Sequence, residues 1–153
     1  TDEFLLPKQS IPSMLIKNLN PYISCNGAAE QAIHLYESAL GAKVQELMRF
    51  SQMPCETITP EHHNRIMHCM LAVGDRTLML SDGMPGKQVP PSGHVSIALD
   101  FADSAEMAKA FDALAAGGTV TMPIGDAFWG AKFGMLIDTF GVHWMFHHAL
   151  PKE

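Results

Sequence analysis

The sequence contains little of what several protein classes require. Charged residues make up 17% and aromatic residues 8% of the 153 positions, and the three cysteines, Cys25, Cys55 and Cys69, form no Cys-x-x-Cys pair. No run of Lys or Arg reaches three and the formal net charge is −6, so the basic footprint of a nucleic-acid-binding protein is absent. No apolar stretch approaches the roughly 18 residues that cross a membrane. We therefore expect neither nucleic-acid binding nor membrane insertion.

The composition instead favours a globular protein of a reducing compartment. Hydrophobic residues reach 47%, which is enough for a packed core. An odd number of cysteines suits a compartment in which thiols stay reduced. The first residues include Asp2 and Glu3 and lack the basic segment of a secretory signal. The expected localisation is cytoplasmic.

The first half of the chain predicts one strand, one helix and three further strands. Residues 1–18 are predicted to form an N-terminal arm, followed by a short strand over Tyr22–Cys25. Apolar residues recur at helical spacing from about Ala28 to Leu40, and Gly41 supplies the left-handed residue that ends a helix. The three strands that follow are predicted over Lys43–Phe50, Ile66–Val73 and Arg76–Ser81.

The second half repeats this order. A strand is predicted over His94–Phe101, and Asp103 with Glu106 resembles a capping box at the start of a helix that runs to about Ala116. The glycine pair Gly117-Gly118 ends this helix. The last three strands are predicted near Thr119–Ile124, Lys132–Asp138 and Val142–His148.

The two halves align without gaps through their helices, at an offset of 76 residues. Gly41 then matches Gly117, and Val44 matches Val120. The same strand–helix–three-strand order surrounds both helices, which favours a true internal repeat. The sequence therefore predicts one domain over 19–148, made of two βαβββ modules (19–82 and 92–148), and a tail over 149–153.

Each module has one helix, which can cover only one face of its sheet. The other faces of two paired sheets then enclose a shared concave space, so the predicted fold class is α+β with a curled mixed sheet around a pocket. Periodicity leaves open which way His68, His143 and Met145 point. In the strand that opens the second module, alternate residues should pack on the helix (Val95, Ile97, Leu99, Phe101) or face the concavity (His94, Ser96, Ala98, Asp100).

Short motifs run in order through the chain from about residue 19 to residue 148. They are Asn20-Pro-Tyr-Ile-Ser-Cys-Asn-Gly27, Ala32-Ile-His-Leu-Tyr36 with Leu40-Gly41, Ile66-Met-His68, Ser81-Asp-Gly-Met-Pro85, Phe128-Trp-Gly130, Phe133-Gly-Met-Leu-Ile-Asp138 and Phe140-Gly-Val-His-Trp144. In order and spacing they resemble PhnB-like proteins, a branch of the vicinal-oxygen-chelate superfamily that includes glyoxalases, bleomycin-resistance proteins and dioxygenases.

The resemblance implies paired βαβββ modules, a pocket inside the curled sheets and a homodimer. Metal-dependent members of the superfamily place ligands at three positions, which fall here on Pro21 or Tyr22, on His94 and on Met145. Proline has no ligating side chain, and a thioether is a poor ligand for hard or borderline divalent metals. Only His94 clearly retains a ligand, so a divalent metal is disfavoured and no cofactor is assigned. A site rebuilt from His94, His143 and His147 stays open as an alternative.

Seven residues are predicted to line a small-molecule pocket, each with an ordinary structural alternative. His94 could be a pocket donor or a histidine at the solvent edge. Trp129 could stack on a ligand or close the core. Asp82 could stand at the pocket mouth or belong to an Asp-Gly turn. The full set is Tyr22, His68, Asp82, His94, Trp129, His143 and Met145, and no catalytic residue is assigned.

Two functions fit these residues. The first is a small-molecule-binding protein of unassigned substrate that lacks the full metal triad. The alternative is a metal-dependent or histidine-based enzyme of the lyase, isomerase or transferase type, acting on a small oxygenated substrate with His94 and His68 as acid–base groups. Some PhnB-like proteins are called 3-demethylubiquinone methyltransferases, but no glycine-rich nucleotide loop follows the first predicted strand here.

Overall fold

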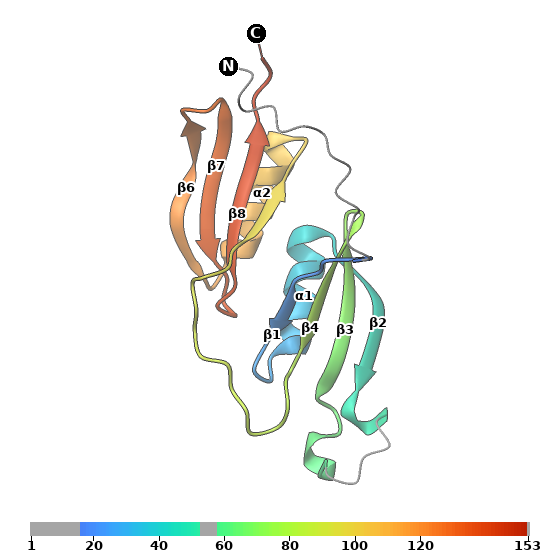
Figure 1. The fold of residues 1–153 in the computed structure, drawn as a ribbon. Coiled ribbons are helices and arrows are strands. Elements are labelled where there is room, and N and C mark those ends of the chain that lie inside the picture. The colour runs from blue at the N-terminus through green and yellow to red at the C-terminus, as the bar shows by residue number, and fades with distance from the viewer. Residues whose placement is uncertain (1–15, 53–57, 153) are drawn as a thin grey trace, which may run out of the picture.

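A computed structural model describes residues 16–52 and 58–152, and it contains two modules of the same topology (Figure 1). The first module comprises β1 (Tyr22–Ser24), α1 (Ala29–Leu40), β2 (Lys43–Arg49), β3 (Ile66–Val73) and β4 (Arg76–Ser81). The second comprises β5 (Ile97–Asp100), α2 (Ser104–Ala115), β6 (Thr119–Ala127), β7 (Ala131–Ile137) and β8 (His143–Ala149). Two single-turn 3-10 helices, Phe50–Gln52 and Pro60–His62, lie between β2 and β3. The predicted α+β fold of two βαβββ modules is confirmed.

The predicted domain boundaries stay predictions. Most of the proposed N-terminal arm (residues 1–15) and the last residue of the proposed tail lie outside the described residues, as does Cys55. No helix in the described part of the chain is both long and apolar enough to span a membrane.

Each module forms its own four-stranded mixed sheet. The strand orders are β1-β4-β3-β2 and β5-β8-β7-β6, so the first strand of each module pairs in parallel with its last strand. The remaining neighbours are antiparallel. Strands β1 and β5 are therefore the matching edges of the two sheets, and the described strands do not close into a barrel.

The helix ends follow from local sequence. Gly41 adopts φ 65° after α1, and its N–H donates to the Glu37 carbonyl. Only glycine adopts this left-handed conformation at little cost, so the helix ends where the sequence predicts. Helix α2 begins with Asp103, whose Oδ2 accepts the Glu106 N–H at 2.9 Å, as expected for a capping residue.

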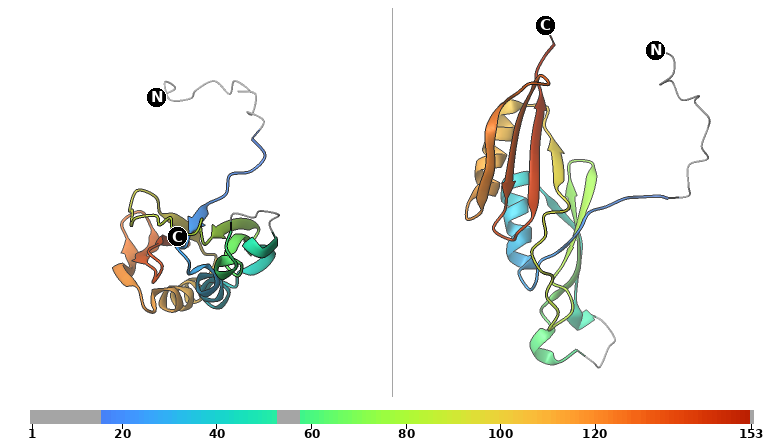
Figure 2. Two further views of the ribbon diagram at one scale, coloured as in Figure 1. Left: turned by 90° about the horizontal axis from the view of Figure 1, so that it is seen from below. Right: turned by 60° about the vertical axis from the view of Figure 1, so that its left-hand side comes forward.

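The modules share one core, built where their helices meet. Figure 2 shows α1 and α2 side by side, each lying against its own sheet. Tyr36 of α1 packs edge-on against Trp144 of β8, with ring centroids 5.5 Å apart, and both residues are almost completely buried. The apolar faces of both helices and both sheets belong to the same cluster, so neither module has a core of its own.

Two strand boundaries differ from the prediction. The strand expected over His94–Phe101 is wrong at its start, because β5 pairs with β8 only from Ile97 to Asp100. Val95, expected on the helix, is instead 77% exposed. Strand β6 runs past the predicted end at Ile124, since it is a sheet edge where Pro123 costs no ladder hydrogen bond and a register shift accommodates it.

Candidate functional site: the open sheet faces

Each sheet has one face on its helix and one face free of it, here called the open face. In β3, Cys69 and Leu71 are buried while His68 and Met70 are only partly covered, so the latter pair lies on the open face. In β8, Trp144 and Phe146 are buried, which places His143, Met145 and His147 on the open face. Burial therefore places His68, His143 and Met145 on the open faces, a question that periodicity alone left undecided.

Methionines are concentrated on both open faces. Residues paired across strands share a face, so the register identifies neighbours. Met79 pairs with Met70 in the first module, and Met135 pairs with Met145 in the second. The open-face methionines are Met48, Met70 and Met79 in the first sheet and Met122, Met135 and Met145 in the second. Flexible, polarisable side chains of this kind make an adaptable apolar surface.

A groove of about 710 Å³ lies between the matching edges of the two sheets. Tyr22 of β1 lines one wall, and Phe140 and His143 line the opposite wall. The connecting segment 88–92 forms a third wall, held by Asn26, whose side chain accepts from the Val89 N–H at 2.8 Å and donates to the Val89 carbonyl at 2.9 Å. The groove thus brings two predicted pocket residues together from different modules.

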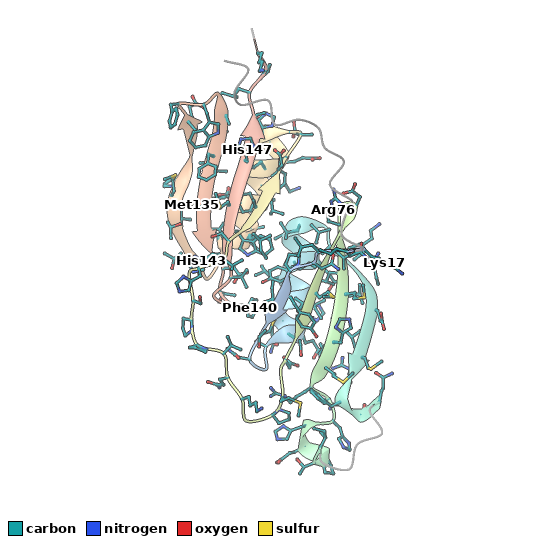
Figure 3. The ribbon with its side chains drawn as sticks, viewed as in Figure 1. Lys17, Arg76, Met135, Phe140, His143 and His147 are labelled. Carbon is teal, nitrogen blue, oxygen red and sulfur yellow. The ribbon has the colours of Figure 1, made fainter. Side chains whose placement is uncertain are left out.

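A larger groove of about 910 Å³ runs beside β5 and the end of α1. Its polar rim carries Lys17 and Arg76, labelled in Figure 3, together with acidic residues that offset their charge. None of the seven predicted pocket residues lines it. We therefore place the candidate site in the smaller groove and on the open faces that adjoin it.

Tyr22 and His68 form a pair on the open face of the first sheet. The Tyr22 hydroxyl lies 3.1 Å from His68 Nδ1, and the two ring centroids are 5.7 Å apart. Strand β4 separates β1 from β3, so the tyrosine reaches across one strand to make this contact. The hydrogen bond orients the Tyr22 ring, which lines the smaller groove.

Histidine, carboxylate and indole meet on the open face of the second sheet. His147 Nδ1 lies 3.1 Å from Asp100 Oδ1, and Trp129 Nε1 donates to His147 Nε2 at 3.4 Å. Trp129 also packs edge-on against Phe133, with centroids 5.4 Å apart. Figure 3 shows His147, Met135 and His143 on this sheet. Of these residues, only Trp129 and His143 belong to the predicted pocket set.

Asp82 is placed away from any ligand surface. It is 4% exposed, and its two carboxylate oxygens accept the N–H groups of Ala29 and Ile66, each at 2.7 Å. It therefore caps α1 and fixes the start of β3. These contacts favour the structural alternative for Asp82 over a place at the pocket mouth.

His94 is exposed in the segment before β5. Its backbone N–H donates to the Ser92 hydroxyl at 3.4 Å, and the neighbouring Gly93, not His94, lies against the His143 ring. Among the described residues, no three His, Cys, Asp or Glu side chains come close enough to hold a metal ion. With Pro21 or Tyr22 and Met145 at the other two positions, the donor set does not match the metal triad that the resemblance implies.

Buried ionisable groups lie on the helix side, away from the open faces. Burial, with Asp82 and Asp138 nearby, raises the pKa of Cys25 to about 12. Burial also raises the pKa of Cys69 to about 11, and it raises the pKa of Tyr36 well above its usual range, helped by Asp138. These groups stay protonated at neutral pH and have no role as bases or nucleophiles.

Sequence reasoning missed two features. It left the Asp100–His147 pair unassigned, although alternation had placed Asp100 on the concave face. It also missed Asp138, which is 3% exposed and accepts from Tyr36 Oη at 2.7 Å, Trp144 Nε1 at 2.9 Å, and the N–H groups of Phe140 and Val142. For Asp138, the only signal in the sequence was its position at the end of a predicted buried strand.

A model of the glyoxalase/bleomycin resistance protein/dioxygenase superfamily matches residues 18–146. The chain belongs to this superfamily. Protein YjdN of Escherichia coli K12 is 32% identical over 136 residues, covering 83% of this chain and 92% of that protein. An uncharacterised protein of Mycobacterium bovis is 31% identical over 132 residues, covering 82% and 79%.

Solved structures of the superfamily share this arrangement of modules. Protein PA1353 from Pseudomonas aeruginosa superposes with a TM-score of 0.78 at 36% identity, covering 88% of this chain and 98% of that one. A putative 3-demethylubiquinone-9 3-methyltransferase, PhnB protein, from Bacillus cereus superposes with a TM-score of 0.73 at 22% identity, covering 87% and 100%. The second likeness supports the PhnB-like fold alone.

Proposed function

We propose that this protein binds a small organic molecule on the open face of its second sheet. The observation that carries the proposal is the surface between His143 and His147, which has Met145 and Met135 as a partly buried apolar floor. The two histidines are four positions apart along the strand, a span of about 13 Å. Small-molecule sites combine a mostly apolar lining with a few oriented polar groups in a concave space, and this surface supplies the apolar lining and the polar groups.

The adjoining groove extends this site toward the first module. His143 belongs to both, and Tyr22 on the facing wall is oriented by His68. A ligand that covers the methionine floor could therefore also donate to or accept from these side chains. The donor set does not support a metal triad, so the proposed binding uses no metal.

We further propose that a second copy of the chain covers the open faces. Large apolar side chains on them are unusually accessible in a single chain: Tyr22 is 54%, Met122 44% and Trp129 50% exposed. Exposed apolar surface of this extent on a folded chain favours a protein partner. A homodimer would enclose the ligand between two sheets. The buried free thiols Cys25 and Cys69 are compatible with the cytoplasmic location proposed for this function.

The test uses p-nitrophenol, a planar aromatic hydroxyl compound, and protein with 13C-labelled methionine methyl groups. Addition of the probe should shift the NMR signals of Met135 and Met145, while the fully buried Met107 signal should stay in place. Met145→Ala should weaken binding several-fold, and Met84→Ala, in the exposed segment after β4, should leave binding unchanged. An unmoved Met145 signal at millimolar probe would overturn the proposal.

The dimer is tested separately by light scattering after gel filtration. A mass near twice the chain's 16.7 kDa is expected, and Met122→Glu should halve it. If the wild-type protein elutes as a monomer at high micromolar concentration, the homodimer is wrong. The proposed binding surface is unaffected by that result.

A further inference from the structure

His147 has both ring nitrogens engaged, and the two partners are of opposite kinds. Asp100 Oδ1 stands 3.1 Å from Nδ1, and Trp129 Nε1 stands 3.4 Å from Nε2. An indole N–H can only donate, and an ionised carboxylate can only accept. Nε2 must therefore accept from Trp129, and the ring proton must lie on Nδ1, directed at Asp100.

This tautomer leaves the lone pair on Nε2, the nitrogen beside the Trp129 indole. A carboxylate behind Nδ1–H orients the ring and stabilises the positive charge that the imidazole would gain on accepting a proton. Asp100 and His147 occupy paired positions of adjacent parallel strands, so backbone hydrogen bonding fixes their separation. The other cross-strand neighbour of His147 is Phe133, which is not ionisable.

Trp129 covers the reactive nitrogen without locking it. The indole sits at the tip of the β6–β7 hairpin, is 50% exposed, and is followed by Gly130 at φ 81°. Its hydrogen bond to Nε2 is long, at 3.4 Å, compared with the usual value near 2.9 Å. A water molecule or a ligand hydroxyl could take the place of the indole N–H at small cost. The rings of Trp129 and Phe133 would then stand beside the same nitrogen as an aromatic wall.

We propose that His147 is a general base, positioned by Asp100 and covered at rest by Trp129, which promotes the hydrolysis of small aryl esters. The inference rests on the proposed function, because the substrate's ring would lie against Trp129 and Phe133 over the methionine floor. The proposal therefore extends the function from binding a small molecule to hydrolysing one.

The proposed step balances with water as the only co-reactant. His147 Nε2 takes a proton from a water molecule as the water oxygen bonds to the ester carbonyl carbon. The bond between that carbon and the aryl oxygen then breaks, releasing a carboxylic acid and an aryloxide. The proton on Nε2 passes to the aryloxide or to solvent, and the imidazole returns to its Nδ1–H tautomer.

The first experiment reads the tautomer directly. Long-range 15N–1H correlation spectra at pH 8 should show His147 with its proton on Nδ1. In Asp100→Asn the side-chain amide can donate to Nδ1, so the population should move toward Nε2–H. A wild-type His147 protonated on Nε2 would overturn the proposal whatever its activity.

The second experiment measures hydrolysis of p-nitrophenyl acetate. His147→Gln should lower kcat/KM at least tenfold, since a positioned base typically contributes a hundredfold or more. Asp100→Asn should lower kcat about three- to tenfold with KM little changed. Trp129→Phe keeps an aromatic ring but removes the covering N–H, so it should raise kcat about two- to fivefold. His34→Gln, an exposed histidine on α1, is the matched control and should stay within twofold of wild type.

The two proposals fail in different ways. If p-nitrophenol shifts the Met135 and Met145 signals but His147→Gln hydrolyses the ester as fast as wild type, the base is wrong and the binding surface stands. If the probe shifts neither signal, the binding surface is wrong and the catalytic proposal falls with it. A rate lost in His147→Gln and raised in Trp129→Phe, with the signals shifted, is the expected result.

Discussion

The two modules have the same topology but anchor their helices differently. Helix α2 is capped by Asp103, three residues from the N–H that it accepts. Helix α1 has no side-chain cap of its own at Ala28, and receives one from Asp82, which lies 53 residues further along the chain. A local cap stabilises one helix, whereas a distant cap also joins the helix to β3 and β4. The first module therefore depends on its tertiary structure for a contact that the second obtains from neighbouring residues.

The open faces of the two sheets also differ, in the partner that each gives to its histidine. The first pairs His68 with a neutral phenol, while the second pairs His147 with a carboxylate. A carboxylate partner favours a histidine that accepts protons, and a phenol does not. In the proposed catalysis the second sheet supplies the base and the first sheet supplies an oriented tyrosine.

The largest expected effect is at Asp138, a buried carboxylate that serves both modules. Asp138→Ala leaves the Tyr36 hydroxyl, the Trp144 indole and two backbone N–H groups without their acceptor. Unfolding in urea should show a loss of about 3–5 kcal/mol. Tyr36→Phe removes a single donor and should cost about 1 kcal/mol. A loss below 1 kcal/mol in Asp138→Ala would contradict a shared buried link between the modules.

The two helix caps should differ in strength. Asp82→Ala removes the acceptor of two backbone N–H groups in a buried site, so we expect the free energy of unfolding to fall by about 2–3 kcal/mol. Asp103→Ala removes one exposed cap and should cost about 1 kcal/mol. Equal losses of unfolding free energy in the two variants, measured side by side in urea, would show that the distant cap stabilises the fold no more than the local one.

Alkaline pH should weaken the shared core through Cys25. Burial raises the pKa of Cys25 from 9.0 to about 12, so the folded state holds the thiol proton when the unfolded chain loses it. Below pH 9 both states are protonated and the shift has no effect. As pH rises from 9 toward 12, ionisation favours the unfolded state and stability falls. Cys25→Ala should flatten this fall in urea titrations, and an unchanged slope would argue against the burial of this thiol.

The smallest effect is expected from Tyr22→Phe. The hydroxyl that it removes is exposed and makes one hydrogen bond, so stability should change by about 0.5 kcal/mol or less. The His68 ring signals in NMR should shift clearly, whereas those of His147 should not. A shift at His147 would mean that the two open faces are coupled within one chain.

Local patterns predicted most elements, because helix and strand boundaries here have short-range causes. Gly41 and Asp103 mark helix ends through the conformations and hydrogen bonds of their own neighbourhoods. Strand β5 was the exception, since a strand extends only as far as its partner, and β8 pairs with no residue before Ile97. Likewise, Asp82 looked like part of a turn or a pocket mouth because its acceptor role depends on Ala29 and Ile66, far from it in sequence.

The sequence by itself determined the repeat and the order of elements, since these depend on local spacing and residue type. Only the tertiary structure decided which faces stay open and which polar groups meet. Tyr36 and Asp138 are 102 positions apart, and Asp100 and His147 are 47 apart. Such pairs are set by strand register and helix packing across the whole chain, and no local periodicity carries that information.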